Sequence, residues 1–464
     1  MYWQYRHYDN ILLRLNSTGS ISLIATRQTR FPLLMQLSIL TSFVAFLLVF
    51  PISVIVEIYS SFGIFQYKAL FVKFRYALLL VTAIFCGMNL VINLGPWLRL
   101  FSCYAYVLLL VYINSVVIFH IDEIGNAADT TESAAQFYYP IFLNYVLYFM
   151  IGTHVLFLRN FRYFILLFTV LAGIVVVNFV DFIALRIDIS NYVEGASKGN
   201  YQFIGDALAL SSLLVMAMFP NPLFRIILAV CTVVVLFLVG SRTSFAVFAL
   251  TSFLIVLLNS QMRLFSIAGV VALAFGIFYS NTINWEELEQ TNPRMVLIFS
   301  EYEDDYSVIG RKDRSESGWI DISNSPITGN FGGQRVFNGG WAAYMHNVGS
   351  YWRQFGFVPF AMVLSLYMFF IWICTVRLRK TKNVYYVTSL LLGSFLIIES
   401  VISRSFVFGY LHMFFGLQLA YHAWYKYGDS FYISKASLRK KRHRRRKKKR
   451  SIRTENSLNA YTSK

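Results

Sequence analysis

The sequence predicts an all-α polytopic membrane protein with about twelve transmembrane helices and one large folded periplasmic loop. Composition is the first reason: 57% of the 464 residues are hydrophobic, only 14% are charged, and the mean hydropathy is +0.56. A soluble domain needs roughly a quarter charged residues to cover its surface. The second reason is that apolar runs recur along the whole chain, which favours one helical bundle over several separate domains.

Twelve apolar runs are long enough, or nearly so, to cross a hydrocarbon core of about 30 Å. The two runs that begin at Phe203 and just after Arg242 are short, so tilted or partly buried helices are expected there. The first run is too long for a signal-peptide core and is expected to remain as the first spanning helix. The runs centre on residues 34–55, 76–94, 101–119, 137–157, 163–184, 203–219, 223–240, 243–259, 264–280, 355–376, 384–402 and 405–425.

The distribution of Lys and Arg predicts the orientation of the bundle. With the N-terminus inside, the cytoplasmic connections carry 13 of these residues and the short outer connections carry 7, as the positive-inside rule requires. The net charge of +18 comes mostly from a tail that holds twelve Lys or Arg between Lys435 and Arg450. The positive-inside rule and anionic lipid explain this tail better than nucleic acid does. The exception is Lys68, Lys73 and Arg75, which fall on the outer side.

This orientation divides the chain into four parts. Residues 1–280 hold helices 1–9 and a cytoplasmic N-terminus, residues 281–353 form the periplasmic loop, residues 354–425 hold helices 10–12, and residues 426–464 form a basic cytoplasmic tail. The tail is expected to bind anionic membrane lipids. The loop contains four tryptophans, which are too many for a disordered linker. It is therefore expected to fold as a small helical cap on the bundle.

Few charged residues lie inside the apolar runs, and such charges are functional candidates because they are costly in lipid. They are Asp181, Asp206, Arg242, Glu399 and Arg404, and the predicted topology puts each toward the outer end of its helix. A polar site at the outer membrane face is the functional interpretation. The alternative is that these residues only mark helix ends in the headgroup zone.

The four cysteines lie in apolar runs and are interpreted as small core residues, with no disulfide framework and no zinc spacing. They are Cys86, Cys103, Cys231 and Cys374. The chain also lacks an Asp and His cluster for a metal, a P-loop ending and a nucleophile elbow. No metal and no cofactor are therefore expected.

Arg242 lies in Gly240-Ser241-Arg242-Thr243, between two apolar runs joined by almost nothing. A tight hairpin at the interface would hold its guanidinium as a fixed fork of donors, which suits bidentate phosphate binding. The alternative is an arginine that extends to ordinary lipid headgroups.

The loop carries His346-Asn347 just before an apolar run. A neutral imidazole can accept a proton from a sugar hydroxyl, so His346 is a candidate base. A histidine packed among aromatic rings or capping a helix is the alternative, and Asn347 would orient the ring or cap a helix. Earlier in the loop, Arg311 and Arg314 are candidates for a second phosphate clamp, and the glycines near them would let backbone N–H groups approach an anion.

Three further residues are candidates for substrate binding. Tyr201 and Asp206 lie in the stretch 199–206, and Arg335 lies in the loop. Asp206 would hold a sugar hydroxyl or pair with a nearby arginine. It would otherwise be an acid that the dipole favours near a helix N-terminus.

The order of these motifs resembles the O-antigen polymerase and ligase superfamily of bacterial envelope glycosyltransferases. Ser-Arg-Thr opens a late helix, and a long outer loop follows with Gly-Arg, Pro-x-x-Gly, further glycines and His-Asn. The motif-bearing region covers roughly residues 186–360. Many members have a Trp four residues after the loop arginine. Here that position is Ser315 and the nearest Trp is Trp319, which leaves the choice between Arg311 and Arg314 open.

The resemblance implies metal-independent inverting transfer of a glycan from undecaprenyl diphosphate at the outer face of a bacterial inner membrane. Arginines matching Arg242 and Arg311 would hold the diphosphate, and the histidine matching His346 would act as base. The leading hypothesis is a polymerase that joins lipid-linked repeat units, with a chain-length regulator as a candidate partner. The alternatives are a ligase that moves polymer to lipid A core, and a transporter or flippase of lipid-linked glycans.

Overall fold

The computed structural model describes residues 33–92, 100–119, 134–181, 187, 200–258, 306–333, 345–378 and 384–427. These parts are helical and contain no strands, which confirms the all-α class for them. The helices are α1 (Leu33–Val49), α2 (Pro51–Ser61), α3 (Lys68–Ile92), α5 (Phe101–Phe119), α7 (Ala134–His154), the 3-10 helix η2 (Val155–Phe161), α8 (Arg162–Asn178), α9 (Tyr201–Met218), α10 (Pro222–Val239), α11 (Arg242–Leu258), α15 (Tyr306–Asn324), α17 (Gly349–Phe355), α18 (Phe357–Leu378), α19 (Val384–Ile402) and α20 (Tyr410–Tyr427).

Eight helical segments of the described chain are long and apolar enough to cross a membrane. Two of them exceed a single predicted run: α1 and α2 join as Leu33–Ser61, and α7, η2 and α8 join as Tyr138–Asn178. The predicted run at 264–280 lies outside the described residues. The structure therefore supports a polytopic membrane bundle, and the number of twelve spans stays a prediction.

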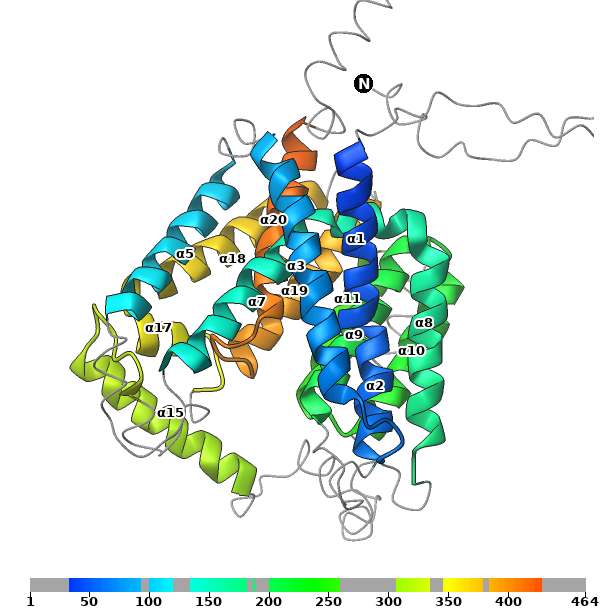
Figure 1. Cartoon of the computed structure of the whole chain (residues 1–464), viewed down its shortest axis with the longest axis horizontal. Coiled ribbons are helices and arrows are strands. Elements are labelled where there is room, and N and C mark those ends of the chain that lie inside the picture. Colours follow the sequence, from blue (N-terminus) through cyan, green and yellow to red (C-terminus); the bar gives the residue numbers. More distant parts are fainter. Residues whose placement is uncertain are drawn as a thin grey trace, which may run out of the picture.

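Helix α9 lies at the centre of the bundle (Figure 1). Every residue from Ile204 to Met218 is buried, and α2, α8, α10, α11 and α19 pack around the helix. A helix that is buried on all sides needs apolar residues on every face, which explains the continuous run. This short run was expected to be tilted or partly buried, and the structure shows that it is almost completely buried.

The outer helices show the opposite pattern, with large apolar side chains exposed on their outward faces. Leu70, Phe74 and Leu80 of α3 and Ile227 and Val230 of α10 are among them. Exposed apolar surface of this extent would be unfavourable in water and is typical of a face that contacts lipid.

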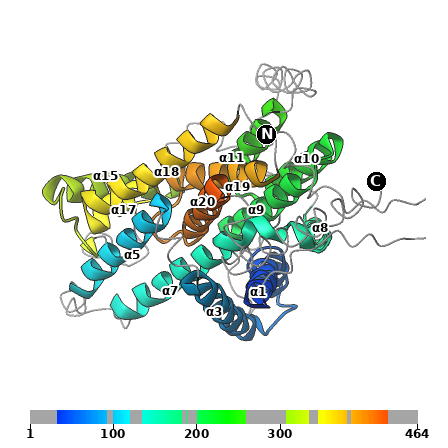
Figure 2. The ribbon, with the colours of Figure 1, turned by 90° about the horizontal axis from the view of Figure 1, so that it is seen from above.

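The two ends of the bundle differ. Helix α1 begins and α20 ends at one end, whereas α15 and α17 lie at the opposite end (Figure 1). Seen from above, α15 lies beside α17 at the periphery of the bundle (Figure 2). The described parts of the predicted periplasmic loop are thus helical and lie at one end. The compartment that each end faces stays a prediction.

The cysteine interpretation holds for three positions and is wrong for one. Cys86, Cys103 and Cys374 are buried free thiols, but Cys231 is exposed on α10. Position 231 points outward from the bundle, where a small, weakly polar thiol is compatible with lipid.

Helices α7 and α20 form a long, close contact that depends on glycine. A Cβ at Gly416 would overlap the Phe149 carbonyl oxygen, and a Cβ at Gly152 would overlap the Met413 carbonyl oxygen. Small residues let two membrane helices approach until their backbones touch. This contact positions the start of α20, which borders the candidate site described below.

We expect Gly416→Ala to lower the midpoint of thermal unfolding of the protein in detergent, because the two backbones must separate to admit the methyl group. Gly173→Ala is the matched control, since a Cβ at this helical glycine meets nothing within 4 Å. The control should be neutral or stabilising by about 0.5–1 kcal/mol from helix propensity alone. Equal midpoints for both variants would contradict the proposed α7–α20 contact.

Candidate functional site

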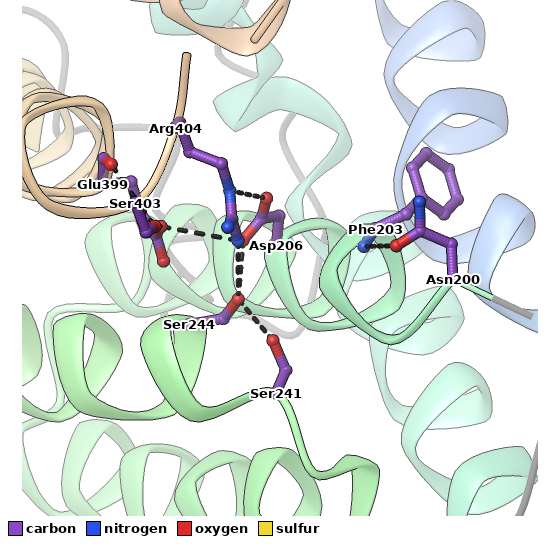
Figure 3. A network of polar contacts seen from close by, with 8 residues as sticks. All are labelled: Asn200, Phe203, Asp206, Ser241, Ser244, Glu399, Ser403 and Arg404. Atoms are coloured by element: carbon purple, nitrogen blue, oxygen red, sulfur yellow. Dashed lines mark hydrogen bonds and ion pairs between the residues drawn. The ribbon is translucent and has the colours of Figure 1, made fainter. Parts of the chain in front are cut away.

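The first group of polar residues lies where α9, α11 and the α19–α20 connection meet (Figure 3). Asn200 caps α9, with its Oδ1 accepting a hydrogen bond from the Phe203 backbone N–H at 3.0 Å. This start places Asp206 in the second turn of α9, where its side chain is 3% exposed. A carboxylate so deeply buried requires partners for its charge.

Arg404 is the main partner of Asp206. Its Nε donates to Asp206 Oδ2 at 3.0 Å and its Nη2 donates to Oδ1 at 2.7 Å, a bidentate arrangement. Ser244 Oγ also donates to Asp206 Oδ1 at 2.6 Å, and Ser241 Oγ lies 2.8 Å from Ser244 Oγ. The prediction that Asp206 pairs with an arginine is therefore confirmed.

Glu399 adds a second carboxylate to this group. Its Oε2 lies 3.4 Å from Arg404 Nη2 and accepts a hydrogen bond from Ser403 Oγ at 2.6 Å. Burial alone lowers the pKa of Arg404, but the charges of Asp206 and Glu399 raise it above its ordinary value, so the guanidinium stays charged. Glu399 Oε1 and Arg404 Nη1 are buried without a hydrogen-bond partner in the described structure.

A tight hairpin brings α11 into this group, as the sequence predicts. Helix α10 ends at Val239, Gly240 adopts the left-handed conformation with φ 74°, and α11 begins at Arg242. Gly205 makes the approach to α9 possible, because a Cβ there would lie 2.5 Å from Ser241 Cβ. Arg242 is half-buried and directly follows Ser241. Two predicted site residues, Arg242 and Asp206, are thus brought to the same end of the bundle.

The second group joins the described parts of the loop. Arg314 of α15 donates from Nη1 to His346 Nε2 at 3.0 Å. A guanidinium can only donate, so this contact selects the neutral imidazole with its proton on Nδ1. Both side chains are half-buried. The structure therefore brings together the predicted base and one of the two loop arginines.

A buried ion pair holds α15 against the segment that leads into α18. Arg353 is fully buried, and its Nε donates to Asp321 Oδ2 at 2.7 Å. Asn330 completes the unit, because its Nδ2 donates to Asp321 Oδ1 at 2.9 Å and its backbone N–H donates to the Arg353 carbonyl at 2.6 Å. These bonds fix the relative position of α15 and α17, and hence of Arg314 and His346.

The backbone N–H groups of Gly329 and Gly332, which were expected to approach an anion, are instead engaged in hydrogen bonds within the chain. The N–H of Gly329 donates to the Ser325 carbonyl at 2.9 Å, and the N–H of Gly332 donates to Gln354 Oε1 at 3.0 Å. A Cβ at Gly356 would overlap the Ile327 carbonyl oxygen. These glycines let the turn pack on the backbone near α17, so their role is structural.

A hydrogen bond between α17 and the α19–α20 connection links the two groups. Ser350 Oγ of α17 accepts a hydrogen bond from the Phe406 backbone N–H at 2.7 Å, and Phe406 is two residues from Arg404. Helix α17 is also anchored to the bundle through Tyr351, whose hydroxyl lies 3.4 Å from Nε2 of the buried His412. The segment that bears His346 is thereby fastened to the connection that bears Arg404.

The other predicted residues have less definite positions. Asn347 Oδ1 accepts a hydrogen bond from the Gly349 N–H at 2.9 Å and so forms the turn before α17, whose N-cap is Val348 with no side-chain cap hydrogen bond. Tyr201 is the first residue of α9. Arg311 lies on α15 one turn before Arg314, but its side chain is outside the described part of the chain, and Arg335 lies outside the described residues altogether.

Sequence reasoning assigned no role to Ser244, Ser350, Asp321 or Arg353. Ser244, Ser350 and Asp321 belong to no distinctive sequence pattern. Their hydrogen-bond partners lie 32 to 56 residues away along the chain. Arg353 carried the best available signal, since an arginine beside an apolar run needs a counter-charge.

The arrangement offers cations, one imidazole and buried carboxylates at one end of a membrane bundle. Within the described ranges, no group of three His, Cys, Asp or Glu side chains is placed to hold a metal ion. A comparison with known families finds no matching family model, and no curated protein matches the chain.

We expect Asp206→Ala to lower the free energy of unfolding by about 3–5 kcal/mol, because it leaves the buried Arg404 guanidinium without its bidentate partner. Arg404→Ala should cost a similar amount. The double variant should cost clearly less than the sum, as a double-mutant cycle in detergent measures. Lys312→Ala is the control, since this exposed residue should change stability by about 0.5 kcal/mol or less. Additive losses would contradict the pairing.

Proposed function

We propose that this protein is a membrane glycosyltransferase that polymerises undecaprenyl-diphosphate-linked oligosaccharide repeat units at the outer face of a bacterial inner membrane. The observation that carries the proposal is the 3.0 Å contact between Arg314 and His346. It joins a fixed cation to a neutral imidazole. Glycosyl transfer from a diphosphate donor to a hydroxyl acceptor requires both groups: the cation for the leaving diphosphate and the imidazole for the hydroxyl proton.

The imidazole supplies the base. In the reaction, the acceptor sugar hydroxyl replaces Arg314 at His346 Nε2. The hydroxyl oxygen attacks the anomeric carbon of the donor while its proton passes to Nε2. The new glycosidic C–O bond forms as the bond between the anomeric carbon and the diphosphate oxygen breaks, and the electron pair leaves with the diphosphate. A single displacement of this kind inverts the anomeric configuration.

The arginines stabilise the leaving group. Negative charge accumulates on the diphosphate as the bond breaks, and guanidinium groups held in place lower the energy of that state. Arg314, displaced from the imidazole by the acceptor, is then available to the diphosphate, and Arg242 approaches from the hairpin. Arg311 is a further candidate from the same helix as Arg314. Asp206 holds Arg404 and Ser244 and so supports the frame around Arg242.

The membrane bundle agrees with a lipid-linked donor. The diphosphate of such a donor lies at the membrane surface, and Asp206, Arg242 and Arg404 all lie at or near the ends of bundle helices. The network around Asp206 is built from α9, α11 and the α19–α20 connection, so a headgroup there would meet fixed charges rather than mobile side chains.

We expect His346→Ala to abolish detectable polymer formation, with a loss of about a hundredfold or more in rate, because the variant lacks the group proposed to accept the hydroxyl proton. The assay supplies purified full-length protein with a lipid-linked repeat unit and measures product length on a gel. Protein abundance and thermal midpoint serve as folding controls. Wild-type polymer in this variant would remove the catalytic role of His346.

The same assay separates the two enzyme hypotheses. Polymer formed from the lipid-linked repeat unit alone identifies a polymerase. Transfer that occurs only when lipid A core is added identifies the ligase.

We expect Arg314→Gln to reduce the rate by about a hundredfold, since it removes a preorganised donor to the leaving group. Lys312→Gln is the matched control: it removes one positive charge from the same helix at an exposed position two residues away. The control should retain most of the activity. If both variants lose activity equally, the effect belongs to the general charge of α15 and not to the contact with His346.

A further inference from the structure

Arg75 is a cation in the apolar part of the bundle without an acidic partner among the described residues. Its Nη1 donates to Ser53 Oγ at 3.2 Å, and its Nε is buried and has no hydrogen-bond partner. The guanidinium carbon lies 5.6 Å from the centre of the Tyr76 ring and 5.9 Å from that of Phe203. Aromatic faces attract a cation but do not neutralise its charge.

The nearest carboxylate along the chain is already engaged. Glu57 Oε1 lies 3.0 Å from Lys68 Nζ and also accepts a hydrogen bond from the Asn200 backbone N–H at 3.2 Å. Asp206, the other acid at this end of α9, is bound by Arg404 and Ser244. An arginine within a membrane helix is costly unless something pairs with it.

Other buried polar atoms near Arg75 also lack partners. The Tyr410 ring lies 5.1 Å from the Tyr148 ring, one helical turn from Asn144, and 5.4 Å from the Phe408 ring, over which the Arg404 guanidinium lies. Both the Tyr410 hydroxyl and Arg404 Nη1 are buried without a hydrogen-bond partner. Asn144 reaches the same region, since its Nδ2 donates to the Tyr76 hydroxyl at 3.4 Å. Buried polar groups almost always have partners, so a cluster of exceptions indicates a bound ligand.

The chemistry of the free atoms defines that ligand. Three of these atoms, Arg75 Nε, Arg404 Nη1 and the Tyr410 hydroxyl, can donate, and two of them belong to cations. Asn144 Oδ1 and Glu399 Oε1, which also lack a partner in the described structure, can only accept. Oxygen atoms with negative charge satisfy such donors best, and guanidinium groups favour phosphate in particular.

We propose that Arg75, together with Arg404 and Tyr410, binds a phosphate group of a membrane lipid. The phosphate assignment stands on the contacts of Arg75, and the choice of a polyprenyl diphosphate over an ordinary phospholipid rests on the proposed function. Two regions distant in the sequence supply this site: α3, and the α19–α20 connection with the start of α20. Ser53 of α2 and Phe203 of α9 hold the Arg75 side chain.

The test measures lipid binding by the full-length protein in phosphatidylcholine nanodiscs, by native mass spectrometry. Undecaprenyl diphosphate and phosphatidylglycerol are titrated separately. Arg75→Gln should weaken binding by about tenfold or more, the value of one charge-assisted hydrogen bond. Arg75→Lys should bind more weakly than wild type, because a point charge does not replace the fork. Tyr410→Phe should weaken binding less.

Lys73→Gln is the matched control, because it removes one charge from an exposed position of the same helix. It should change the affinity by less than twofold. Loss for undecaprenyl diphosphate alone assigns the site to the donor lipid, and equal loss for both lipids assigns it to phospholipid headgroups. Wild-type affinity in both Arg75→Gln and Tyr410→Phe, or an equal loss in Lys73→Gln, overturns the proposal. If Arg75→Gln does not fold, Arg75→Lys and Tyr410→Phe decide.

The outcome is separable from that of the proposed function. His346→Ala should bind the lipid with wild-type affinity. Arg75-dependent binding without any polymer formation would remove the glycosyltransferase and keep the lipid site. Polymer formation that depends on His346 but not on Arg75 would keep the glycosyltransferase and remove the assignment of the site to the donor lipid.

Discussion

The bidentate pair of Asp206 and Arg404 is the interaction on which the arrangement of this end of the bundle depends. In an apolar interior each unpaired charge costs several kcal/mol, a large part of the net stability of a domain, so the pair favours structures in which the two segments meet. Asp206 belongs to the central helix and Arg404 to the connection before α20, 198 residues later. Ser244 attaches the Gly240–Arg242 hairpin to the same carboxylate. One pair thereby sets the position of three elements around Arg242.

A buried ion pair also fixes the relative position of the described loop segments. Asp321 and Arg353 form a buried pair, and Asn330 uses the remaining carboxylate oxygen. The two ion pairs are joined by a short path, because Ser350 of α17 binds the backbone of Phe406 beside Arg404. A catalytic contact such as that of Arg314 with His346 requires support of this kind, since a displacement of about 1 Å is enough to reduce catalysis strongly.

The sequence was a good guide to local structure and to which residues bear charge. Gly240-Ser241-Arg242 predicts the hairpin, and the order of the motifs predicts that the described part of the loop holds a histidine and an arginine for one site. An arginine partner for Asp206 was one of the alternatives that the sequence offered. The sequence did not identify Arg404 as that arginine, because helix periodicity identifies a face but not the neighbour that covers it. The glycines near residue 330 misled for a related reason: their N–H groups are used by Ser325 and Gln354, partners that only the tertiary structure reveals.

The structure also explains the three positive charges near the start of α3. Lys68, Lys73 and Arg75 depart from the positive-inside rule in the predicted orientation, and three outer cations near one helix would favour the reverse insertion. The three residues differ in their environments. Lys68 is paired with Glu57, and Lys73 is exposed. Of these three residues, only Arg75 has a buried donor without a partner in the described structure. A cation retained against the cost of burial and against the topological preference must be stabilised by a partner, and the atoms around it leave an anion at the membrane surface as the partner that fits.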